Sequence, residues 1–481
     1  MSFIDPVRRL GEWFSDWSLR YIPDPYVIGI LLTLLTVASA LVSGSAPKET
    51  MDAWYTGVWT LLPFMATLSV MLMAGDAIAK SPSVTHALER IASIPNSPFV
   101  AVWFTAFVAM VTALVSWAIG LIVGAIMARR VAYECRQKGI KVHYPLLAAA
   151  GYTSLMIFHS GLSSSAALIM TDPSLIPASF PASVQNGIPL SETLGSTANL
   201  VSAGLLLTVI PVVMAAMHPK DEIRELPGEI RSEIKENLES EPPTETQPED
   251  TAFPSRPTLT FADRLNNSQL LGLVIAIFPL YYVINTWFLV SDPSRFIFQP
   301  GGLSKLTLNS INALFLFFAI VLWKRPINIV NQMKDSVKNI SGIIFMFPFY
   351  AGIAGLLTNT GLAQQFTEVL ATVATKETWP VIGILISAIV NVFIPSGGGQ
   401  WVAQGPILIE TSQQFGYEPW VAVVIEILGD PLTNMIQPFW AIPLLAIADL
   451  RARDIIGYTA VAMVVGLLLV SATVTVFIGL A

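Results

Sequence analysis

Long apolar stretches follow one another along this chain, and the charged residues are gathered in the segments between them. Strands of a membrane barrel would instead alternate apolar and polar residues over about 10 positions. A helix needs about 20 apolar residues to cross about 30 Å of hydrocarbon, so the pattern predicts an all-α polytopic membrane protein of about 10–12 transmembrane helices. The stretches of spanning length are 24–43, 53–79, 98–128, 144–171, 193–217, 268–291, 306–323, 339–366, 378–409, 419–448 and 455–481.

The composition supports a membrane protein. Hydrophobic residues make up 53% of the 481 residues and charged residues 12%, against about 25% charged in soluble domains. The single cysteine and the four histidines show no metal-ligand spacing, so we predict no metal and no cofactor other than a coupling ion. We expect a multi-pass protein of the cell inner membrane.

One polar segment, 218–262, divides the chain. Residues 220–250 carry eleven acidic and four basic residues, which accounts for the whole net charge of −7. The remainder is neutral overall and has no basic face, so we predict no nucleic-acid partner. The division predicts a first transmembrane repeat at 1–217, an acidic flexible linker at 218–262 and a second repeat at 263–481. The start of the linker can form a short amphipathic helix; the rest is expected to be a solvated tether, with a docking role as the alternative.

The two halves share a pattern at an offset of 278 residues. The offset aligns V-S-W-A-I-G-L-I-V-G-A-I-M-A (115–128) with F-I-P-S-G-G-G-Q-W-V-A-Q-G-P (393–406), and brings Gly151 onto Gly429. In each half a glycine-interrupted span is followed by a second interrupted span. Paired interrupted segments at matching places indicate the binding site of a transporter built from inverted repeats. Each repeat is therefore expected to hold a re-entrant hairpin and a broken helix.

Loop charges favour the inversion. Residues 129–141 carry a net charge of +4 and the matching residues 407–419 a net charge of −2. The positive-inside rule places the first loop in the cytoplasm and the second outside. The apolar stretches taken literally give both segments the same orientation, so the side on which the linker lies is left open.

The segment 391–406 holds the strongest candidate for an anion site. Pro395 ends a helix, three glycines permit a tight turn without side chains, and the helix resumes from Gln400 until Gly405-Pro406. Such a turn exposes backbone N–H groups and the positive end of a helix dipole, which suit a carboxylate. A flexible hinge or a tight helix-packing site is the alternative. The predicted binding residues here are Ser396, Gly397, Gly398, Gly399, Gln400 and Trp401.

The segment 425–440 is a candidate broken helix, because Pro431 and Pro438 bracket several polar residues. Its polar side chains Asn434 and Gln437 are predicted to face the substrate, and Thr433 to take part in ion coupling. Asp430 lies four residues after Glu426, on the same helix face. A carboxylate inside a span is a functional hypothesis by default, so Asp430 is predicted to couple transport to a proton or sodium ion. The alternative is that both carboxylates lie at a water-exposed helix end.

The matching segment of the first half, 154–166, is rich in hydroxyl groups and breaks at Ser160-Gly161, two further predicted binding residues. Hydroxyl side chains in spans often bond only to their own helix. His159 is predicted as a proton relay for ion coupling, with a hydrogen-bonded structural histidine as the alternative.

Four motifs together give the chain a family resemblance. They are P-D-P (23–25), F-P-F-Y-A-G-I (347–353), P-S-G-G-G-Q-W-V-A-Q-G-P (395–406) and Q-P-F-W-A-I-P (437–443). With them the chain resembles the short-chain fatty acid transporter family, of the ion-transporter superfamily. The resemblance implies two inverted repeats, a carrier mechanism and short monocarboxylates such as acetoacetate or butyrate as substrates. It implies that Ser396, Gly397, Gly398 and Gly399 meet the carboxylate, with Asn434 and Gln437 opposite. The S-N-T-type hairpin tips of sodium-coupled dicarboxylate relatives are absent, which leaves proton and sodium coupling both open.

The function predicted from the sequence is ion-coupled symport of a small monocarboxylate, with Trp401, Phe439 and Trp440 as walls for its alkyl tail. A dicarboxylate or citrate carrier is the near alternative, but it would need a second cationic or donor-rich pocket. A membrane-embedded enzyme is a distant one, because the serines near His159 have no acidic orienting residue close in sequence, and we predict no enzyme. The expected partners are a small carboxylate and the lipid bilayer, and a homodimer is left open.

Overall fold

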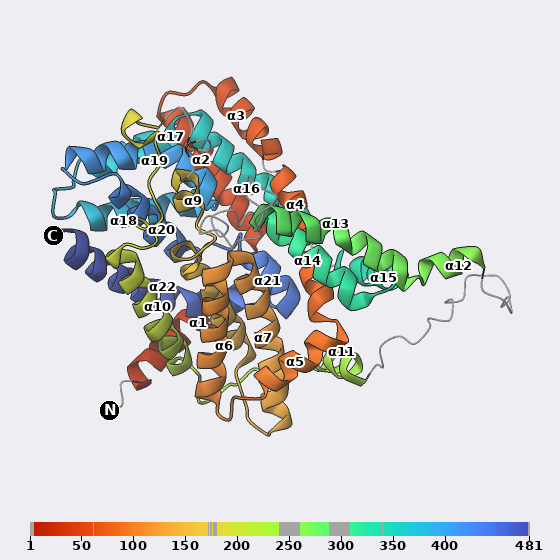
Figure 1. The fold of residues 1–481 in the computed structure, drawn as a ribbon. Helices are drawn as coiled ribbons and strands as arrows, with labels where there is room; N and C mark the ends of the chain where they lie inside the picture. The colour runs from red at the N-terminus through yellow and green to blue at the C-terminus, as the bar shows by residue number, and fades with distance from the viewer. Residues whose placement is uncertain are drawn as a thin grey trace. The chain divides into compact units, whose positions relative to one another are not determined.

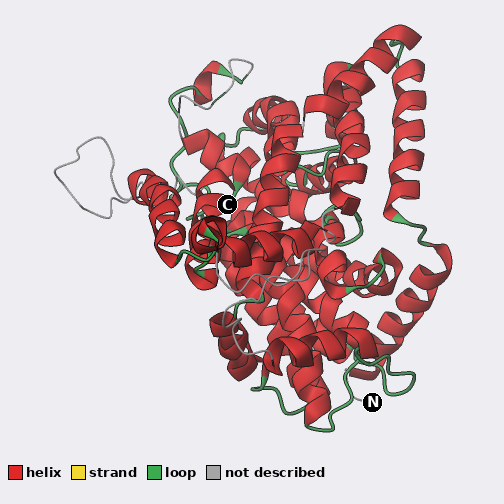
Figure 2. Ribbon diagram, turned by 90° about the vertical axis from the view of Figure 1, so that its right-hand side faces the viewer, coloured by secondary structure: helices red, strands yellow, loops and turns green. Residues whose placement is uncertain are grey.

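The described part of the protein is helical throughout. The computed structural model (Figure 1) describes residues 4–60, 62–171, 173, 176, 180–239, 260–287, 308–337 and 341–479. Those residues form helices joined by loops and contain no strand (Figure 2). The protein is therefore the all-α membrane protein that the apolar pattern predicts. Among the described residues, six apolar segments are long enough to cross a membrane: Pro25–Val42, Pro98–Val115, Tyr144–Thr171, Thr197–Ala216, Gln269–Trp287 and Ala452–Gly479.

The chain forms two compact units, each made of separate stretches of sequence. One unit contains Met1–Met65, Pro95–Glu225 and Gly342–Ala481, and the other contains Ala66–Ile94 and Leu226–Ser341. The division at 217 and 263 predicted from the sequence rests on internal similarity rather than on compactness, so these repeat boundaries remain a prediction. The count of 10–12 spans and the inverted orientation remain predictions as well.

The larger unit contains both sets of interrupted spans. Its helices in chain order are α1 (Ile4–Tyr21), α2 (Pro25–Val42), α3 (Pro47–Thr60), the start of α4 (Leu62–Ala79), α6 (Pro98–Val115), α7 (Trp117–Gln137), α8 (Tyr144–Tyr152), the 3-10 turns η1 (Thr153–Met156) and η2 (Phe158–Ser160), α9 (Ser165–Thr171), the 3-10 turn η3 (Ala182–Val184) and α10 (Thr197–Ala216). They continue with α16 (Ser341–Asn359), α17 (Leu362–Ala371), α18 (Trp379–Phe393), α19 (Gly397–Gln414), α20 (Trp420–Thr433), α21 (Ala441–Ala448), α22 (Ala452–Val474) and a π-helical end, η6 (Thr475–Gly479).

The offset of 278 residues recurs in the helix boundaries. Adding it to α6, α7, α8 and α9 gives 376–393, 395–415, 422–430 and 443–449, which fall on α18, α19, α20 and α21. The order of a long helix, a break, a second helix and a broken segment is thus the same in both halves. A common order of elements is what an internal repeat requires.

Small residues let the interrupted helices approach closely. A Cβ on Gly124 of α7 would overlap the backbone of Gly151 in α8, and a Cβ on Gly151 would overlap that of Gly124. Gly161 lies in the same way against the backbone of Leu114, whose carbonyl accepts the N–H of Leu162 at 2.7 Å. Such contacts between backbones are typical of helix packing in membranes.

The breaks lie where the sequence predicts them, but the glycine turn differs from the prediction. α18 ends at Phe393 and Pro395 lies in the break, whereas the three glycines form the first turn of α19 instead of a bare turn. The reason is local: Ser396 caps α19, and its Oγ accepts the N–H of Gly399 at 3.3 Å. The prediction that this helix stops at Gly405-Pro406 was also wrong, because α19 continues through Pro406 to Gln414.

The smaller unit contains most of α4 and the helices α5 (Pro82–Ala92), α11 (Gly228–Glu239), α12 (Phe261–Asn266), α13 (Gln269–Trp287), α14 (Leu308–Trp323) and α15 (Pro326–Ser336). α11 is the amphipathic helix predicted for the start of the linker. Ile230 and Ile234, one turn apart, are buried, while Arg231 and Ser232 are exposed. The predicted tether continues into 240–259, which lies outside the described residues.

Candidate functional site

The four interruptions meet at one small cavity in the larger unit. It has a volume of about 60 Å³. Such a cavity needs about 10–15 Å³ to hold one water, so the space suits about four to six water-sized groups. Pockets for drug-sized ligands measure about 300–1,000 Å³, so only a small guest fits here. The lining residues are Trp117, Leu155, Phe158, His159, Ser165, Ser396, Gly397, Gly398, Asp430, Asn434 and Trp440.

The N-terminus of α19 forms one wall of the cavity. The first hydrogen bond of the helix runs from the N–H of Gln400 to the carbonyl of Ser396 at 2.7 Å. The N–H groups of Gly397 and Gly398 precede this bond, so they have no intrahelical acceptor. Both residues lack a side chain that could cover these donors. Together with the positive end of the helix dipole, this wall suits an anion.

His159 and Asp430 form an ionisable pair at the cavity. Their Nδ1 and Oδ2 atoms are 3.4 Å apart, which is ion-pair distance without hydrogen-bond geometry. His159 is 0% exposed and Asp430 1% exposed. Within the described residues neither ring nitrogen of His159 nor Oδ2 of Asp430 has a hydrogen-bond partner. Buried polar atoms are nearly always paired, so these unpaired atoms make the pair a candidate for binding a guest molecule or a proton.

The broken helices of the two halves are hydrogen-bonded to each other beside the cavity. The hydroxyl of Tyr152 in α8 donates to the carbonyls of Asn434 at 2.9 Å and Gln437 at 3.3 Å. The amide of Asn434 donates to the carbonyl of Leu155 at 3.2 Å and accepts from Asn391 at 2.9 Å. These bonds pair the carbonyl groups of Leu155, Asn434 and Gln437, which follow α8 and α20, and they hold Asn434 in the cavity wall.

A second buried polar group lies one helical turn from Asp430. The carboxylate of Glu426 is 3.4 Å from Nε2 of Gln400, which also donates to Gln404 at 3.1 Å and to the carbonyl of Ser387 at 2.8 Å. Glu426 is 0% exposed. Burial of both carboxylates excludes the alternative of a water-exposed helix end. Asp430 lines the cavity and Glu426 does not, so a molecule bound in the cavity would contact Asp430 but not Glu426.

The structure brings about half of the predicted site residues together. Ser396, Gly397, Gly398, Asn434, Asp430 and His159 line the cavity. Gly399, Gln400, Trp401, Gln437, Ser160, Gly161 and Thr433 do not.

Several of the residues that do not line the cavity have structural contacts instead. Trp401 is fully buried against Phe180, with ring centroids 5.6 Å apart. The hydroxyl of Thr433 donates to the carbonyl of Ala388 at 2.6 Å. Oε1 of Gln437 accepts the N–H of Phe439 at 2.7 Å. The predicted roles of these side chains in binding and coupling remain predictions.

Sequence reasoning did not predict four of the lining residues: Trp117, Leu155, Phe158 and Ser165. Leu155 and Phe158 are apolar residues among apolar residues, so no local signal distinguishes them. Ser165 belongs to a run of serines whose facing directions depend on tertiary packing. Two tryptophans complete the apolar wall, since the rings of Trp117 and Trp440 meet edge to face with centroids 4.9 Å apart. Trp440 is one of the predicted walls for the alkyl tail.

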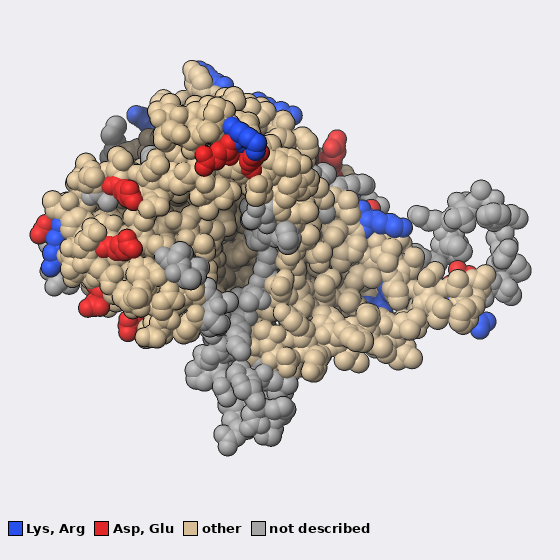
Figure 3. All heavy atoms as spheres, turned by 90° about the horizontal axis from the view of Figure 1, so that it is seen from above, with Lys and Arg blue, Asp and Glu red and all other residues tan. Residues whose placement is uncertain are grey.

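Charged side chains are scarce at the cavity and on the visible surface. Apart from His159 and Asp430, no titratable side chain is among the eleven lining residues. Figure 3 shows a face of the molecule on which Lys, Arg, Asp and Glu side chains are few and scattered. A low density of charge is what lipid contact requires.

Comparison with known proteins identifies the family. A sequence profile of the short chain fatty acid transporter family matches residues 6–478. The chain belongs to this family. Two relatives are provisionally named short-chain fatty acid transporters. The one from Escherichia coli K12 is 32% identical over 95% of this chain and 97% of its own length. The one from Haemophilus influenzae Rd is 30% identical over the same shares. The protein is thus a member of a transporter family, as the sequence motifs indicate.

Solved structures show a weaker likeness. The crystal structure of the Alcanivorax borkumensis YdaH transporter shares 15% identity over 95% of this chain and 98% of its own, with a TM-score of 0.46. The structure of Neisseria gonorrhoeae MtrF, which represents a class of antimetabolite efflux pumps, also shares 15% identity. The likeness covers 98% of this chain and 97% of MtrF, with a TM-score of 0.46. At this TM-score the likeness supports no argument about mechanism.

Proposed function

We propose that this family member is a secondary carrier of short-chain monocarboxylates in the inner membrane, and that it moves a proton with each substrate molecule. The observation that supports it is the convergence of four helix interruptions on one small cavity that holds both an anion-binding helix N-terminus and the His159–Asp430 pair. Irregular backbone at membrane depth is tolerated where it lines a cavity, and transporters place their substrate there.

The shape of the cavity favours a short monocarboxylate. The carboxylate would meet the N–H groups of Gly397 and Gly398, and the short alkyl tail would lie against the apolar wall of Trp117, Phe158 and Trp440. A dicarboxylate would place a second negative charge in the same space. None of the lining residues is Lys or Arg, so the second charge would have no cationic partner.

The charge balance favours a proton as the coupling ion. A substrate anion beside an ionised Asp430 would place two like charges close together in a buried site, which is costly. One proton on the pair of Asp430 and His159 removes the repulsion. The loaded site then carries one charge fewer, and substrate and proton would cross together. Sodium coupling would instead require several oxygen ligands around the ion.

The test is uptake of radiolabelled butyrate into proteoliposomes under an imposed proton gradient or sodium gradient. We expect saturable uptake driven by the proton gradient in the wild type and no accumulation in Asp430→Asn. Counterflow exchange of butyrate without a gradient shows whether the variant still folds and binds. The matched control is Asp52→Asn, which removes an exposed carboxylate paired with Lys48 at 2.5 Å.

Each outcome decides between the alternatives. Accumulation lost with exchange retained supports proton coupling at Asp430. Accumulation driven by sodium alone would overturn the choice of ion. Unchanged accumulation in Asp430→Asn would remove Asp430 from the mechanism. Uptake of succinate or citrate in place of butyrate would overturn the substrate class.

A further inference from the structure

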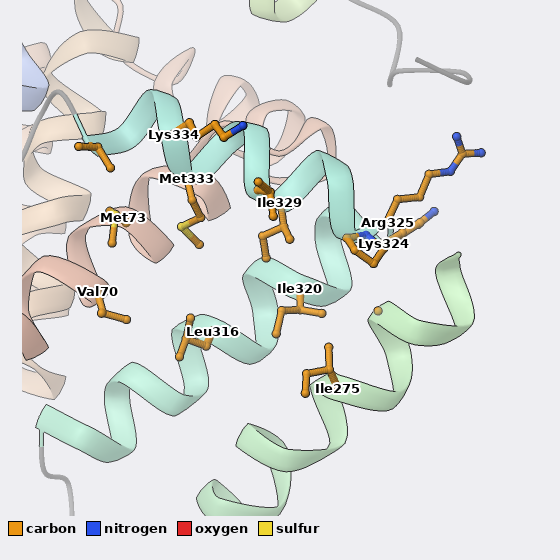
Figure 4. Close-up of a pocket in the computed structure, with 14 residues that line it drawn as sticks. Val70, Met73, Ile275, Leu316, Ile320, Lys324, Arg325, Ile329, Met333 and Lys334 are labelled. Carbon is orange, nitrogen blue, oxygen red and sulfur yellow. The ribbon is translucent and has the colours of Figure 1, made fainter. Parts of the chain in front are cut away.

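The smaller unit contains a large apolar groove that the transport cavity does not account for. It has a volume of about 570 Å³ and lies between α4, α13, α14 and α15 (Figure 4). Its floor is made of aliphatic and thioether side chains, among them Met73, Ile275, Leu316, Ile320, Ile329 and Met333. The volume is within the range of about 300–1,000 Å³ in which proteins bind ligands. A groove of this kind suits a hydrocarbon chain.

Three cationic side chains border this groove. Lys324 and Arg325 occupy the turn between α14 and α15, and Lys334 lies on α15 two turns later. Figure 4 shows Lys324 and Arg325 extending from one end of the groove. Within the described residues none of the three forms an ion pair. The nearest acidic side chain in sequence is Asp335, next to Lys334, so the border keeps a net positive charge.

The helix that carries Lys334 has the character of a helix at the membrane interface. α15 is short, and Ile329 and Met333, one turn apart, face the groove. Lys334 and Asp335 are exposed. A helix with one apolar and one polar face that begins at a basic turn suits the boundary between lipid headgroups and acyl chains. Basic turns between spans are typical of the cytoplasmic side, where anionic lipids give the membrane a negative surface.

The turn before α15 holds the basic residues in place. Lys324 adopts a left-handed backbone conformation with a φ of 60°, which reverses the chain direction after α14. Its carbonyl packs against Gly272 of α13 so closely that a Cβ there would overlap it. Within the same unit, Nε1 of Trp323 donates to the carbonyl of Ala77 at 2.7 Å. The basic end of the groove is therefore built on contacts to two other helices.

We propose that this groove binds one anionic phospholipid, with an acyl chain along its apolar floor, the phosphate at Lys324 and Arg325, and Lys334 adding positive charge further along the border. The combination of hydrocarbon floor and cationic border recognises both parts of such a molecule. A zwitterionic lipid would satisfy the floor alone, and a soluble anion would satisfy the border alone. The proposal concerns a site separate from the transport cavity and holds whatever the substrate is.

The experiment is native mass spectrometry of the full-length protein titrated with phosphatidylglycerol or phosphatidylcholine. We expect the wild type to retain phosphatidylglycerol with about tenfold preference over phosphatidylcholine, since each basic residue near a membrane surface attracts anionic lipid appreciably. Replacing Lys324, Arg325 and Lys334 by glutamine should reduce the preference to about one. The matched control replaces Arg20, Lys141 and Lys376, three exposed basic residues of the larger unit, and should keep it.

A second variant tests the floor without changing charge. Met333→Trp fills the groove with a larger side chain, so an acyl chain can bury less apolar surface there. We expect retention of both lipids to fall at least about fivefold. A melting temperature equal to that of the wild type shows that the variant folds. Equal retention of both lipids by the wild type would overturn the proposal. The proposal would also be overturned if inorganic phosphate raised the melting temperature as much as phosphatidylglycerol does. It would be overturned too if the wild type were a dimer that Met333→Trp dissociates.

Discussion

Gly397 is the position where one methyl group tests the geometry of the transport site most directly. A Cβ added there would overlap Cε1 and Nε2 of His159 and would lie 3.0 Å from Oδ2 of Asp430. His159 is fully buried, and its ring centroid lies 4.0 Å from that of Phe158, so Phe158 blocks one direction in which the ring could turn. Gly397→Ala must therefore displace His159 from Asp430 or shift the start of α19.

The size of the effect follows from the packing. Inserting a methylene into a filled site costs about 1–3 kcal/mol. If this cost falls on the transport-competent arrangement, the rate of uptake falls by about 5- to 150-fold, at about 1.4 kcal/mol for each factor of ten. Alanine stabilises a helix by about 1 kcal/mol relative to glycine, so the melting temperature should change less than the transport rate.

Two matched variants make the test specific. A Cβ on Gly398, the next residue, would lie 3.5 Å from Cβ of Ser165, an ordinary contact that leaves the His159–Asp430 pair in place, so Gly398→Ala should lose less uptake than Gly397→Ala. Gly204 in α10 has no atom within 4 Å of an added Cβ, so Gly204→Ala controls for helix propensity alone. The assay is initial butyrate uptake in proteoliposomes, with melting temperature measured in detergent. Wild-type uptake by Gly397→Ala, or equal losses at Gly397 and Gly398, would refute the contact with His159.

Three further predictions address other parts of the larger unit. Tyr152→Phe removes the donor to the carbonyl of Asn434, so the free energy of unfolding should fall by about 1–3 kcal/mol, seen as a lower melting temperature. An unchanged melting temperature would contradict this hydrogen bond. Trp440→Ala removes part of the apolar wall and enlarges the cavity, so competition assays should show a shift in preference from butyrate toward longer acids. An unchanged order of preference would place the alkyl tail elsewhere. His143 precedes the span 144–171, and its Nδ1 accepts the N–H of Arg224 at 3.1 Å; burial lowers the pKa of His143 to about 3. Because the unfolded chain binds this proton near pH 6.5 and the folded protein does not, stability is lost as the pH falls below about 6.5, by about 2 kcal/mol at pH 5. His143→Gln should flatten the fall in melting temperature between pH 7.5 and 5, and parallel curves would contradict the assignment.

The breaks in the helices could be predicted because their causes are local. Pro395 removes a donor and constrains the residue before it wherever the chain lies, so α18 ends at Phe393 as expected. The conformation of the three glycines could not be predicted in the same way. Glycine permits both a turn and a helix, and here the N-cap hydrogen bond to Ser396 favours the helix. The polar residues of 425–440 were likewise found from their bracketing prolines, without knowledge of their partners.

Hydrophobicity, proline and glycine act over short distances, and motifs are read directly. The sequence alone therefore shows that the chain is a helical membrane protein, where its spans are interrupted and to which family it belongs. Which polar residues share the cavity depends instead on the tertiary structure. Trp401 and Asn434 are equally prominent in the sequence, yet one packs against Phe180 and the other lines the cavity. The rotation of each helix about its axis sets that difference. This rotation depends on packing against helices hundreds of residues away in the sequence. His159 and Asp430, 271 positions apart, meet only because both broken helices end at the same point.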